Sequence, residues 1–359
     1  MKILSMLRKK PLSILLLGLP LAIAAEVFHW GELWIFLFSA LGVVPMAEYI
    51  GEATEALATH TTPRVSGLLN ATLGNAAELI ITIVAIREGL LELVKASITG
   101  SILGNLLLVM GMSFLLGGLK NGLQSFESRN ATRNAVLLIL AVLTILIPSL
   151  LSGSIGPESS MKVEALSLGV AAIMIVLYVL ALIYGFRYEG SPLGHKPTTP
   201  SANHPTWSVR AALTVLGLST LGVVVLSEML VGAVEPVVAS LGVSEFFLGI
   251  ILIPLVGNVA EHLVAVEVAI RNQMDLSVEI AIASSLQIAL FVAPVLVFIS
   301  LLMGNPLQLI FNVFELLALV AGVLITALVS ADGESNWLEG AELLALYLML
   351  GLAFFLLPA

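Results

Sequence analysis

Two short stretches of the chain carry the same acid and the same amide at the same spacing. They read Gly-Asn-Ala-Ala-Glu at 74–78 and Gly-Asn-Val-Ala-Glu at 257–261, and both lie within strongly apolar sequence. The asparagine and the glutamate are three residues apart, which places both side chains on one face of a helix. Carboxylate and amide oxygens are ligands for hard cations. The paired motifs therefore predict a cation site, because ionisable groups in membrane-type sequence are costly and usually functional.

Two downstream segments add small polar residues around this core. The first contributes Ser101 and Asn105, and the second contributes Ser284, Ser285 and Gln287. A glycine precedes each motif asparagine. Glycine loosens the helical backbone and frees carbonyl groups, which is tolerated within a membrane where these carbonyls line a site. Together these groups predict an all-oxygen cage, in which two carboxylates neutralise one divalent cation.

The composition places this cage in a membrane. Of the 359 residues, 59% are hydrophobic and 11% are charged, and the mean hydropathy is +1.08. A soluble domain of this length cannot bury so much apolar surface, so we predict an all-α polytopic membrane protein. The chain has no cysteine, which excludes disulfides and thiolate metal sites. Its fifteen basic residues are scattered, which argues against nucleic-acid binding.

Eleven apolar stretches approach the length of about 20 residues that a membrane-spanning helix needs. The first is an extra helix within 1–30, and the others form two halves of five, 31–186 and 208–359, joined by a predicted cytoplasmic loop at 187–207. Each half crosses the membrane five times, and this odd number gives the two halves opposite orientations. We therefore predict two inverted repeats, as in many secondary transporters. The predicted stretches are 12–28, 33–57, 65–87, 93–117, 131–151, 163–186, 208–235, 243–269, 275–303, 307–329 and 338–357.

The duplication extends beyond the central motifs. Both copies continue with Ala-Ile-Arg, at 85–87 and 269–271. Acids upstream of each motif also match, 180 residues apart. These pairs are Glu48 with Glu228, and Glu55 with Glu235.

Further polar residues are predicted to line a route to the site. Glu48, Glu52 and Glu55 share one helical face. We interpret Glu52, Glu55 and Glu235 as a cation funnel or proton relay, the alternative being acids exposed to water at a helix end. His262 is predicted to support the site by hydrogen bonding rather than as a ligand. A buried carboxylate without its cation takes up a proton, which favours a cation/proton antiporter.

The basic residues set the predicted orientation. With the N-terminus in the cytoplasm, twelve fall inside and three outside, namely Arg87, Lys95 and Lys162. The positive-inside rule therefore favours a cytoplasmic N-terminus and an external C-terminus. The stretch from Arg8 to Ala24 also resembles a signal peptide, an alternative that leaves the later topology unchanged. We expect a bacterial inner membrane, although a vacuole-type membrane fits the same topology.

At these motifs the chain resembles a calcium/proton exchanger of the cation/proton exchanger family, within the calcium/cation antiporter superfamily. The motifs are at 67–78, 100–105, 257–262 and 284–287, and the resemblance covers essentially the whole chain. It implies that the two motif glutamates bind Ca²⁺ and protons alternately, and that Ca²⁺ leaves the cytosol as protons enter. The expected cation ligands are Glu78, Glu261, Asn75, Asn258, Ser101, Ser285 and Gln287, with Asn105 added from its position.

Two features depart from the family pattern. The 187–207 loop lacks an acidic run, and Gly104 stands where the family often has serine. We expect Ca²⁺, protons and the lipid bilayer as partners, no cofactor and no enzymatic activity, and the pattern is compatible with a homo-oligomer. The alternatives are exchange of Na⁺, K⁺ or Mn²⁺ for protons, or a Ca²⁺ leak channel. An intramembrane hydrolase is disfavoured, because only His262 is available to hold a catalytic metal.

Overall fold

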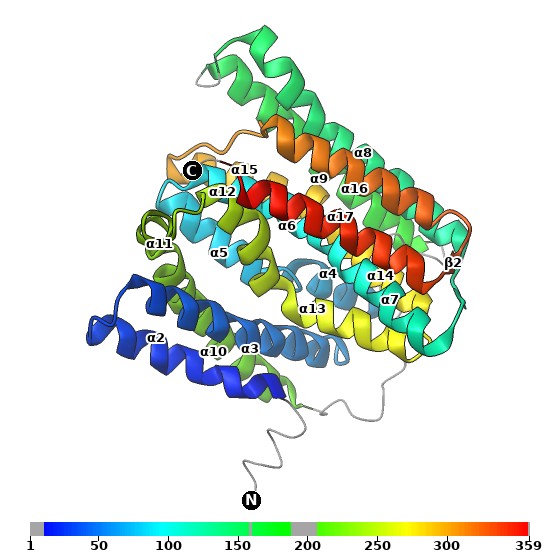
Figure 1. Cartoon of the computed structure of the whole chain (residues 1–359), viewed down its shortest axis with the longest axis horizontal. Coiled ribbons are helices and arrows are strands. Elements are labelled where there is room, and N and C mark those ends of the chain that lie inside the picture. The colour runs from blue at the N-terminus through cyan, green and yellow to red at the C-terminus, as the bar shows by residue number, and fades with distance from the viewer. Residues whose placement is uncertain (1–10, 158–159, 188–206, 358–359) are drawn as a thin grey trace, which may run out of the picture.

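The computed structural model describes residues 11–157, 160–187 and 207–357, and within these ranges the chain is almost entirely helical (Figure 1). The all-α membrane fold predicted from composition is therefore confirmed. Most of the predicted loop at 187–207 lies outside the described residues, as do the basic residues before Pro11.

The first half of the chain runs from a 3₁₀ helix to α9. A π-helical segment at Gly104–Val109 joins α6 to α7 without a break. The elements are the 3₁₀ helix Pro11–Leu17, α2 (Gly18–Val27), α3 (Glu32–Ala58), α4 (Pro63–Leu73), α5 (Ala76–Arg87), α6 (Leu91–Leu103), α7 (Met110–Asn121), β1 (Gln124–Ser125), α8 (Ser128–Ile155) and α9 (Met161–Arg187).

The second half follows a similar order. Its π-helical segments, Leu248–Leu252 and Ile288–Val292, precede α13 and α15. The elements are α10 (Val209–Gly232), α11 (Val234–Leu241), α12 (Glu245–Phe247), α13 (Ile253–Ile270), α14 (Met274–Gln287), α15 (Ala293–Met303), α16 (Val313–Val329), β2 (Glu334–Ser335) and α17 (Trp337–Phe355). Strands β1 and β2 pair antiparallel between the two halves.

Among the described residues, eight helical segments are long and apolar enough to cross a membrane. Two further predicted stretches appear as shorter apolar helices, Leu12–Val27 and Val313–Val329. The eight segments are Glu32–Ala58, Leu91–Asn121, Ala131–Ile155, Met161–Gly185, Val209–Gly232, Glu245–Ile270, Met274–Met303 and Trp337–Phe355.

The continuous helix predicted at 65–87 is wrong, because the chain forms two helices there. Helix α4 ends at Leu73 and α5 begins at Ala76. Between them Asn75 is the N-cap of α5, with φ −95° and ψ 19°. Asparagine is favoured at such positions, although the Asn75 side chain makes no capping hydrogen bond here and instead donates to Gln287. The break places the first motif at a helix end rather than in a helix middle.

The helix predicted at 307–329 starts later than expected. The chain from Leu307 to Phe311 is non-helical and, apart from the half-buried Gln308, buried, and α16 begins only at Val313. Serine hydroxyls satisfy this buried backbone: Ser167 accepts from the Leu309 amide at 3.2 Å, and Ser149 accepts from the Phe311 amide at 3.0 Å. Irregular backbone is stable at such depth only when protein groups bond to it in this way.

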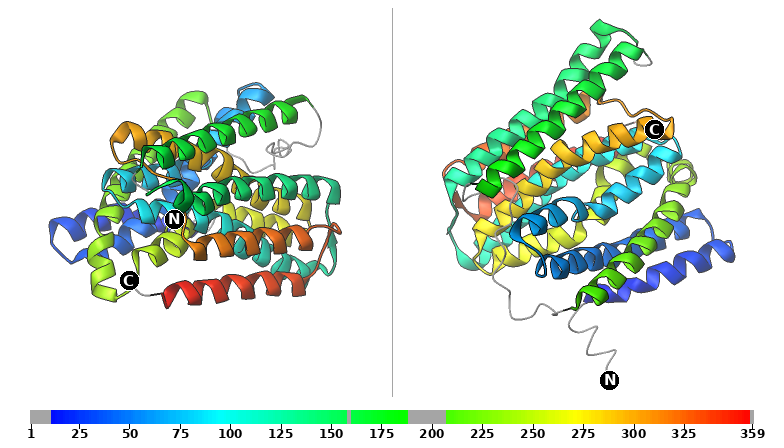
Figure 2. Two further views of the ribbon diagram at one scale, coloured as in Figure 1. Left: turned by 90° about the horizontal axis from the view of Figure 1, so that it is seen from above. Right: turned by 180° about the vertical axis from the view of Figure 1, so that it is seen from behind.

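Helices α3 and α10 form a tightly packed antiparallel pair. A β-carbon added at Gly222 would lie 3.0 Å from Met46 Sδ, and one added at Gly42 would lie 3.0 Å from Leu226 Cδ1. On its other side α3 packs against α2, where a β-carbon at Gly18 would lie 2.6 Å from the Gly42 amide nitrogen. Helices α8 and α9 lie together on the opposite side of the bundle from α2 and α3 (Figure 2).

Helix α6 crosses the segment before α13 at very close range. A β-carbon at Gly100 would lie 2.0 Å from the Ile250 carbonyl oxygen, so only glycine fits there. Small residues permit close helix approach, so the sequence predicts a close crossing at Gly100 and Gly104, and at Gly100 this prediction is confirmed. The same expectation is wrong for Gly104, whose added β-carbon would meet no atom within 4 Å. The Gly100 crossing fixes α6 beside the second motif.

Candidate functional site

The carboxylate of Glu78 lies at the start of α5 and is 2% exposed. Its Oε1 accepts a short hydrogen bond from the Ser101 hydroxyl of α6. The same hydroxyl accepts a hydrogen bond from Asn258 Nδ2 of α13 at 3.2 Å. The acid of the first motif is therefore linked through one serine to the amide of the second motif.

The carboxylate of Glu261 has a similar arrangement on α13. Its Oε2 accepts a hydrogen bond from the Ser284 hydroxyl of α14 at 2.8 Å. Ser284 Oγ in turn accepts from Asn105 Nδ2, in the π-helical segment after α6, at 3.1 Å. Glu261 is half-buried, unlike Glu78. Each acid is thus held by a serine, and each serine by an amide from the other half of the chain.

The glycines of the two motifs bring the acids together. A β-carbon added at Gly74 would lie 3.6 Å from Glu261 Oε1. One added at Gly257 would lie 3.8 Å from the Glu78 β-carbon. Each glycine therefore faces the glutamate of the other motif. The two stretches therefore lie next to each other in a single site.

The remaining predicted ligands divide into two groups. Asn75 and Gln287 are buried in the site, and Asn75 Nδ2 donates to Gln287 Oε1 at 2.8 Å. Ser285 is also buried, but its hydroxyl donates to the Ala281 carbonyl of its own helix at 2.9 Å. The serine that contacts an acid in the second half is Ser284.

Oxygen atoms of the site remain without donors. Among the described residues, Glu78 Oε2 and Asn75 Oδ1 have no hydrogen-bond partner. A buried oxygen without a donor is unfavourable unless a cation, a proton or water satisfies it. Glu78 also lies in the first turn of α5, where the helix dipole favours negative charge. The arrangement is suited to hold a positively charged species between the two motifs.

The polar side chains of the site are carboxylates, amides and hydroxyls. Within the described ranges, no group of three or more histidines and acids is placed to hold a metal ion. His262 is half-buried beside the site, and its Nε2 has no hydrogen-bond partner among the described residues.

The predicted route residues do not lie together. Glu52 and Glu55 are half-buried near the end of α3, where Ala56 and Leu57 pack near Ala212 at the start of α10. Glu235 is exposed in the first turn of α11, beyond the other end of α10. Since α3 and α10 are antiparallel, Glu55 and Glu235 lie at opposite ends of this pair. Glu55 and Glu235 therefore do not form one cluster.

Two polar contacts were not predicted from the sequence. Glu315 is fully buried, and it accepts hydrogen bonds from the Asn312 amide at 2.8 Å and from the Thr99 hydroxyl at 3.2 Å. Its role as the third residue of a capping box at α16 was detectable from the Asn-x-x-Glu spacing. Arg87 forms an ion pair with Glu228 of α10 at 2.9 Å, which no sequence spacing indicated.

Comparisons with known proteins agree with this architecture. The family described as "Sodium/calcium exchanger protein" matches residues 31–187 and 211–356. A protein of Aphanothece halophytica named "Ca(2+)/H(+) antiporter" is 44% identical over 96% of both chains. A Bacillus subtilis protein named "Ca(2+)/H(+) antiporter ChaA" is 44% identical over 95% of this chain and 97% of its own.

Solved structures show the same fold. The structure of native YfkE matches with a TM-score of 0.84 and 42% identity, covering 96% of this chain and 100% of that one. The crystal structure of the H⁺/Ca²⁺ exchanger CAX matches with a TM-score of 0.71 at 16% identity, covering 97% of this chain and 92% of that one, and so supports the fold alone. The resemblance seen in the sequence motifs is confirmed, and the chain belongs to the sodium/calcium exchanger protein family.

Proposed function

We propose that this protein is a secondary antiporter that exchanges Ca²⁺ for protons across a membrane. The observation that carries the proposal is the pair Glu78 and Glu261, which two halves of the chain bring into one oxygen-rich site. Relatives at 44% identity over nearly their whole length are named Ca²⁺/H⁺ antiporters, which supports the same exchange here.

The charge of the site accounts for the exchange. Two buried or half-buried carboxylates cannot both remain ionised at low cost in apolar surroundings. One Ca²⁺ ion neutralises both, and so do protons. The two kinds of cargo therefore compete for the same oxygens, and the site is stable when either is bound. Transport of Ca²⁺ and transport of protons are coupled if the site switches from one side of the membrane to the other only when its carboxylates are neutralised.

The proposed Ca²⁺ ligands are oxygens of both motifs. Glu78, Glu261, Asn75 and Asn258 form the core, with Gln287 beside Asn75. Ser101 and Ser284 orient the carboxylates. In the proposed site Ser284 replaces Ser285, which was predicted from the sequence. Oxygen-only coordination of this kind suits Ca²⁺, which accepts six to eight oxygen ligands.

The orientation in the membrane sets the direction of transport. The excess of basic residues on one side supports a cytoplasmic N-terminus, and the bacterial relative supports a bacterial inner membrane. In that orientation the protein exports Ca²⁺ from the cytosol, driven by protons that move inward. The duplicated motifs support two inverted repeats as the basis of alternating access.

The experiment is ⁴⁵Ca²⁺ uptake by proteoliposomes with an acidic interior. We expect uptake that depends on the pH gradient, and its loss in Glu78→Gln and in Glu261→Gln, because an amide carries no charge to balance either cargo. Glu342→Gln is the matched control, since Glu342 is exposed on α17. Uptake that ignores the gradient would instead indicate a channel, and uptake of Na⁺, K⁺ or Mn²⁺ alone would contradict Ca²⁺ as the cargo.

A further inference from the structure

The duplicated Ala-Ile-Arg sequence ends the two helices that carry the motif glutamates. Arg87 is the last residue of α5, and Arg271 caps the end of α13. The two helices end at opposite sides of the molecule, α5 near α11 and α13 beside the start of α14 (Figure 1). The site chemistry described above does not use either arginine.

The two arginines are paired differently. Arg87 crosses to a neighbouring helix, where it forms an ion pair with Glu228 of α10 at 2.9 Å. It also contacts Glu88 at 3.0 Å. Arg271 instead forms an ion pair with Glu267 of its own helix. One arginine therefore ties a site helix to the α3–α10 pair, while the other is bound within α13.

The duplication identifies the missing counterpart. Glu228 of α10 corresponds to Glu48 of α3 in the other half of the chain. Helix α3 packs beside α13, as α10 packs beside α5. Glu48 is therefore to Arg271 what Glu228 is to Arg87, namely the matching acid on the neighbouring helix. A bridge between them would tie α13 to α3 at the opposite end of the molecule.

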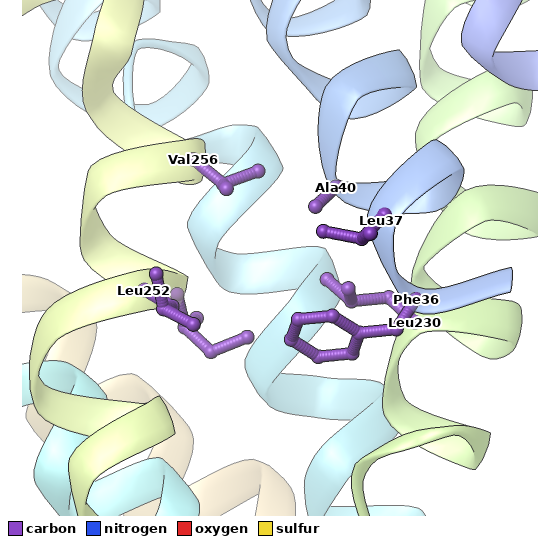
Figure 3. A pocket seen from close by; sticks show the side chains of 7 residues that line it. Phe36, Leu37, Ala40, Leu230, Leu252 and Val256 are labelled. Carbon is purple, nitrogen blue, oxygen red and sulfur yellow. The ribbon is translucent and has the colours of Figure 1, made fainter. Parts of the chain in front are cut away.

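The contact between the α3–α10 pair and α13 is suited to movement. An apolar cavity of about 90 Å³ lies between them, and Figure 3 shows side chains from α3, α10 and the start of α13 pointing into it. Incompletely packed apolar surfaces have few fixed contacts to break when they slide. The lining residues are Phe36, Leu37, Ala40, Leu230, Leu252, Ile253 and Val256.

We propose that Arg87 and Arg271 are reciprocal latches for the α3–α10 pair. In the described conformation the Arg87–Glu228 bridge holds the pair against α5 at one end. In the opposite conformation this bridge opens, and Arg271 leaves Glu267 to bind Glu48 at the other end. The Arg87–Glu228 and Arg271–Glu267 ion pairs both involve exposed side chains. Exposed ion pairs are weak, which suits contacts that open in every turnover. The proposal rests on the proposed exchange function.

The absence of cysteine makes the latch directly testable. In the double variant Arg87→Cys/Glu228→Cys, a bifunctional thiol reagent of short span should cross-link α5 to α10. We expect gradient-driven ⁴⁵Ca²⁺ uptake before the reagent, its loss after cross-linking, and its recovery on reduction. Leu338→Cys/Glu342→Cys is the matched control, because both side chains are exposed on α17 and a cross-link within this one helix should leave uptake unchanged.

The outcomes separate the latch from the function. Full uptake with the 87–228 cross-link in place would overturn the latch and leave antiport intact. Absence of gradient-driven uptake in the untreated wild type would instead overturn the proposed function. The variant Glu48→Cys/Arg271→Cys should cross-link only when the protein turns over, and cross-linking that is independent of turnover would also contradict the latch.

Charge exchange gives a second test that needs no cross-linker. Arg87→Glu should lower the uptake rate, because two acids then face each other between α5 and α10. Arg87→Glu/Glu228→Arg should restore it, since the bridge forms again with reversed polarity. A swap that folds, binds Ca²⁺ and remains as slow as the single variant would contradict the latch.

Discussion

At the scale of single residues, one serine determines how each central carboxylate is held. Ser101 and Ser284 donate to Glu78 and Glu261, and each also accepts from an amide. A serine hydroxyl suits this position because it donates and accepts at once. The serine then fixes one oxygen of each carboxylate, while the second oxygen is available to the transported Ca²⁺ or proton.

Two adjacent serines in α14 provide a sharp test of this arrangement. Ser284→Ala should weaken apparent Ca²⁺ affinity roughly ten- to a hundredfold, because a hydrogen bond to a charged group contributes about 1.5–3 kcal/mol. Ser285→Ala should stay close to wild type, since its hydroxyl donates only to the Ala281 carbonyl of its own helix. The measurement is the Ca²⁺ dependence of uptake in proteoliposomes, and equal effects of the two variants would contradict the assigned roles.

At the scale of helices, the site depends on where helical geometry changes. Helix α5 begins at the first motif, one π-helical segment contains Asn105, and another follows Gln287. Two of the three π segments end two residues before a proline, Pro254 or Pro294. Proline has no amide hydrogen and crowds the preceding turn, so the hydrogen-bond register shifts there. These local changes aim polar groups into the site.

Two glycines on one helical segment test the packing that supports these changes. Gly100→Ala should lower the melting temperature in detergent, because its β-carbon would lie 2.0 Å from the Ile250 carbonyl oxygen. Such overpacking typically costs about 1–3 kcal/mol. Gly104→Ala should leave the melting temperature nearly unchanged, since no atom lies within 4 Å of its added β-carbon. Equal melting temperatures for the two variants would show that the α6 crossing is not tightly packed.

At the scale of the whole molecule, the two halves of the chain contact each other in the central site and through the paired strands. Asn258 reaches Ser101, Asn105 reaches Ser284, and β1 pairs with β2. The α3–α10 pair lies on one flank, where its cavity and the Arg87–Glu228 bridge mark its contact with the site helices. This division separates a polar centre from an apolar boundary.

The predicted orientation of the molecule can be measured with single cysteines. Lys120 and Lys162 are both exposed, and the topology places Lys120 in the cytoplasm and Lys162 outside. In intact cells a membrane-impermeant maleimide should label Lys162→Cys and should label Lys120→Cys only after permeabilisation. The chain has no other cysteine to compete for the reagent. The reverse labelling pattern would overturn the orientation and with it the direction of Ca²⁺ export.

The sequence by itself determined the membrane class and the central acids. Continuous apolar stretches of about 20 residues predict membrane-spanning helices. Charged residues in such sequence are rare enough that the duplicated glutamates and asparagines stood out. The Gly100 crossing was likewise predictable, because small residues permit close helix approach.

Only the tertiary structure decided which neighbours complete the site. Sequence spacing did not distinguish Ser284 from Ser285, because adjacent residues of one helix point about 100° apart and only the position of α13 selects between them. It also placed Glu55 and Glu235 in one route, although the antiparallel packing of α3 and α10 separates them. The Arg87–Glu228 bridge joins residues 141 positions apart. Contacts of this kind depend on how helices pack, which local sequence patterns do not encode.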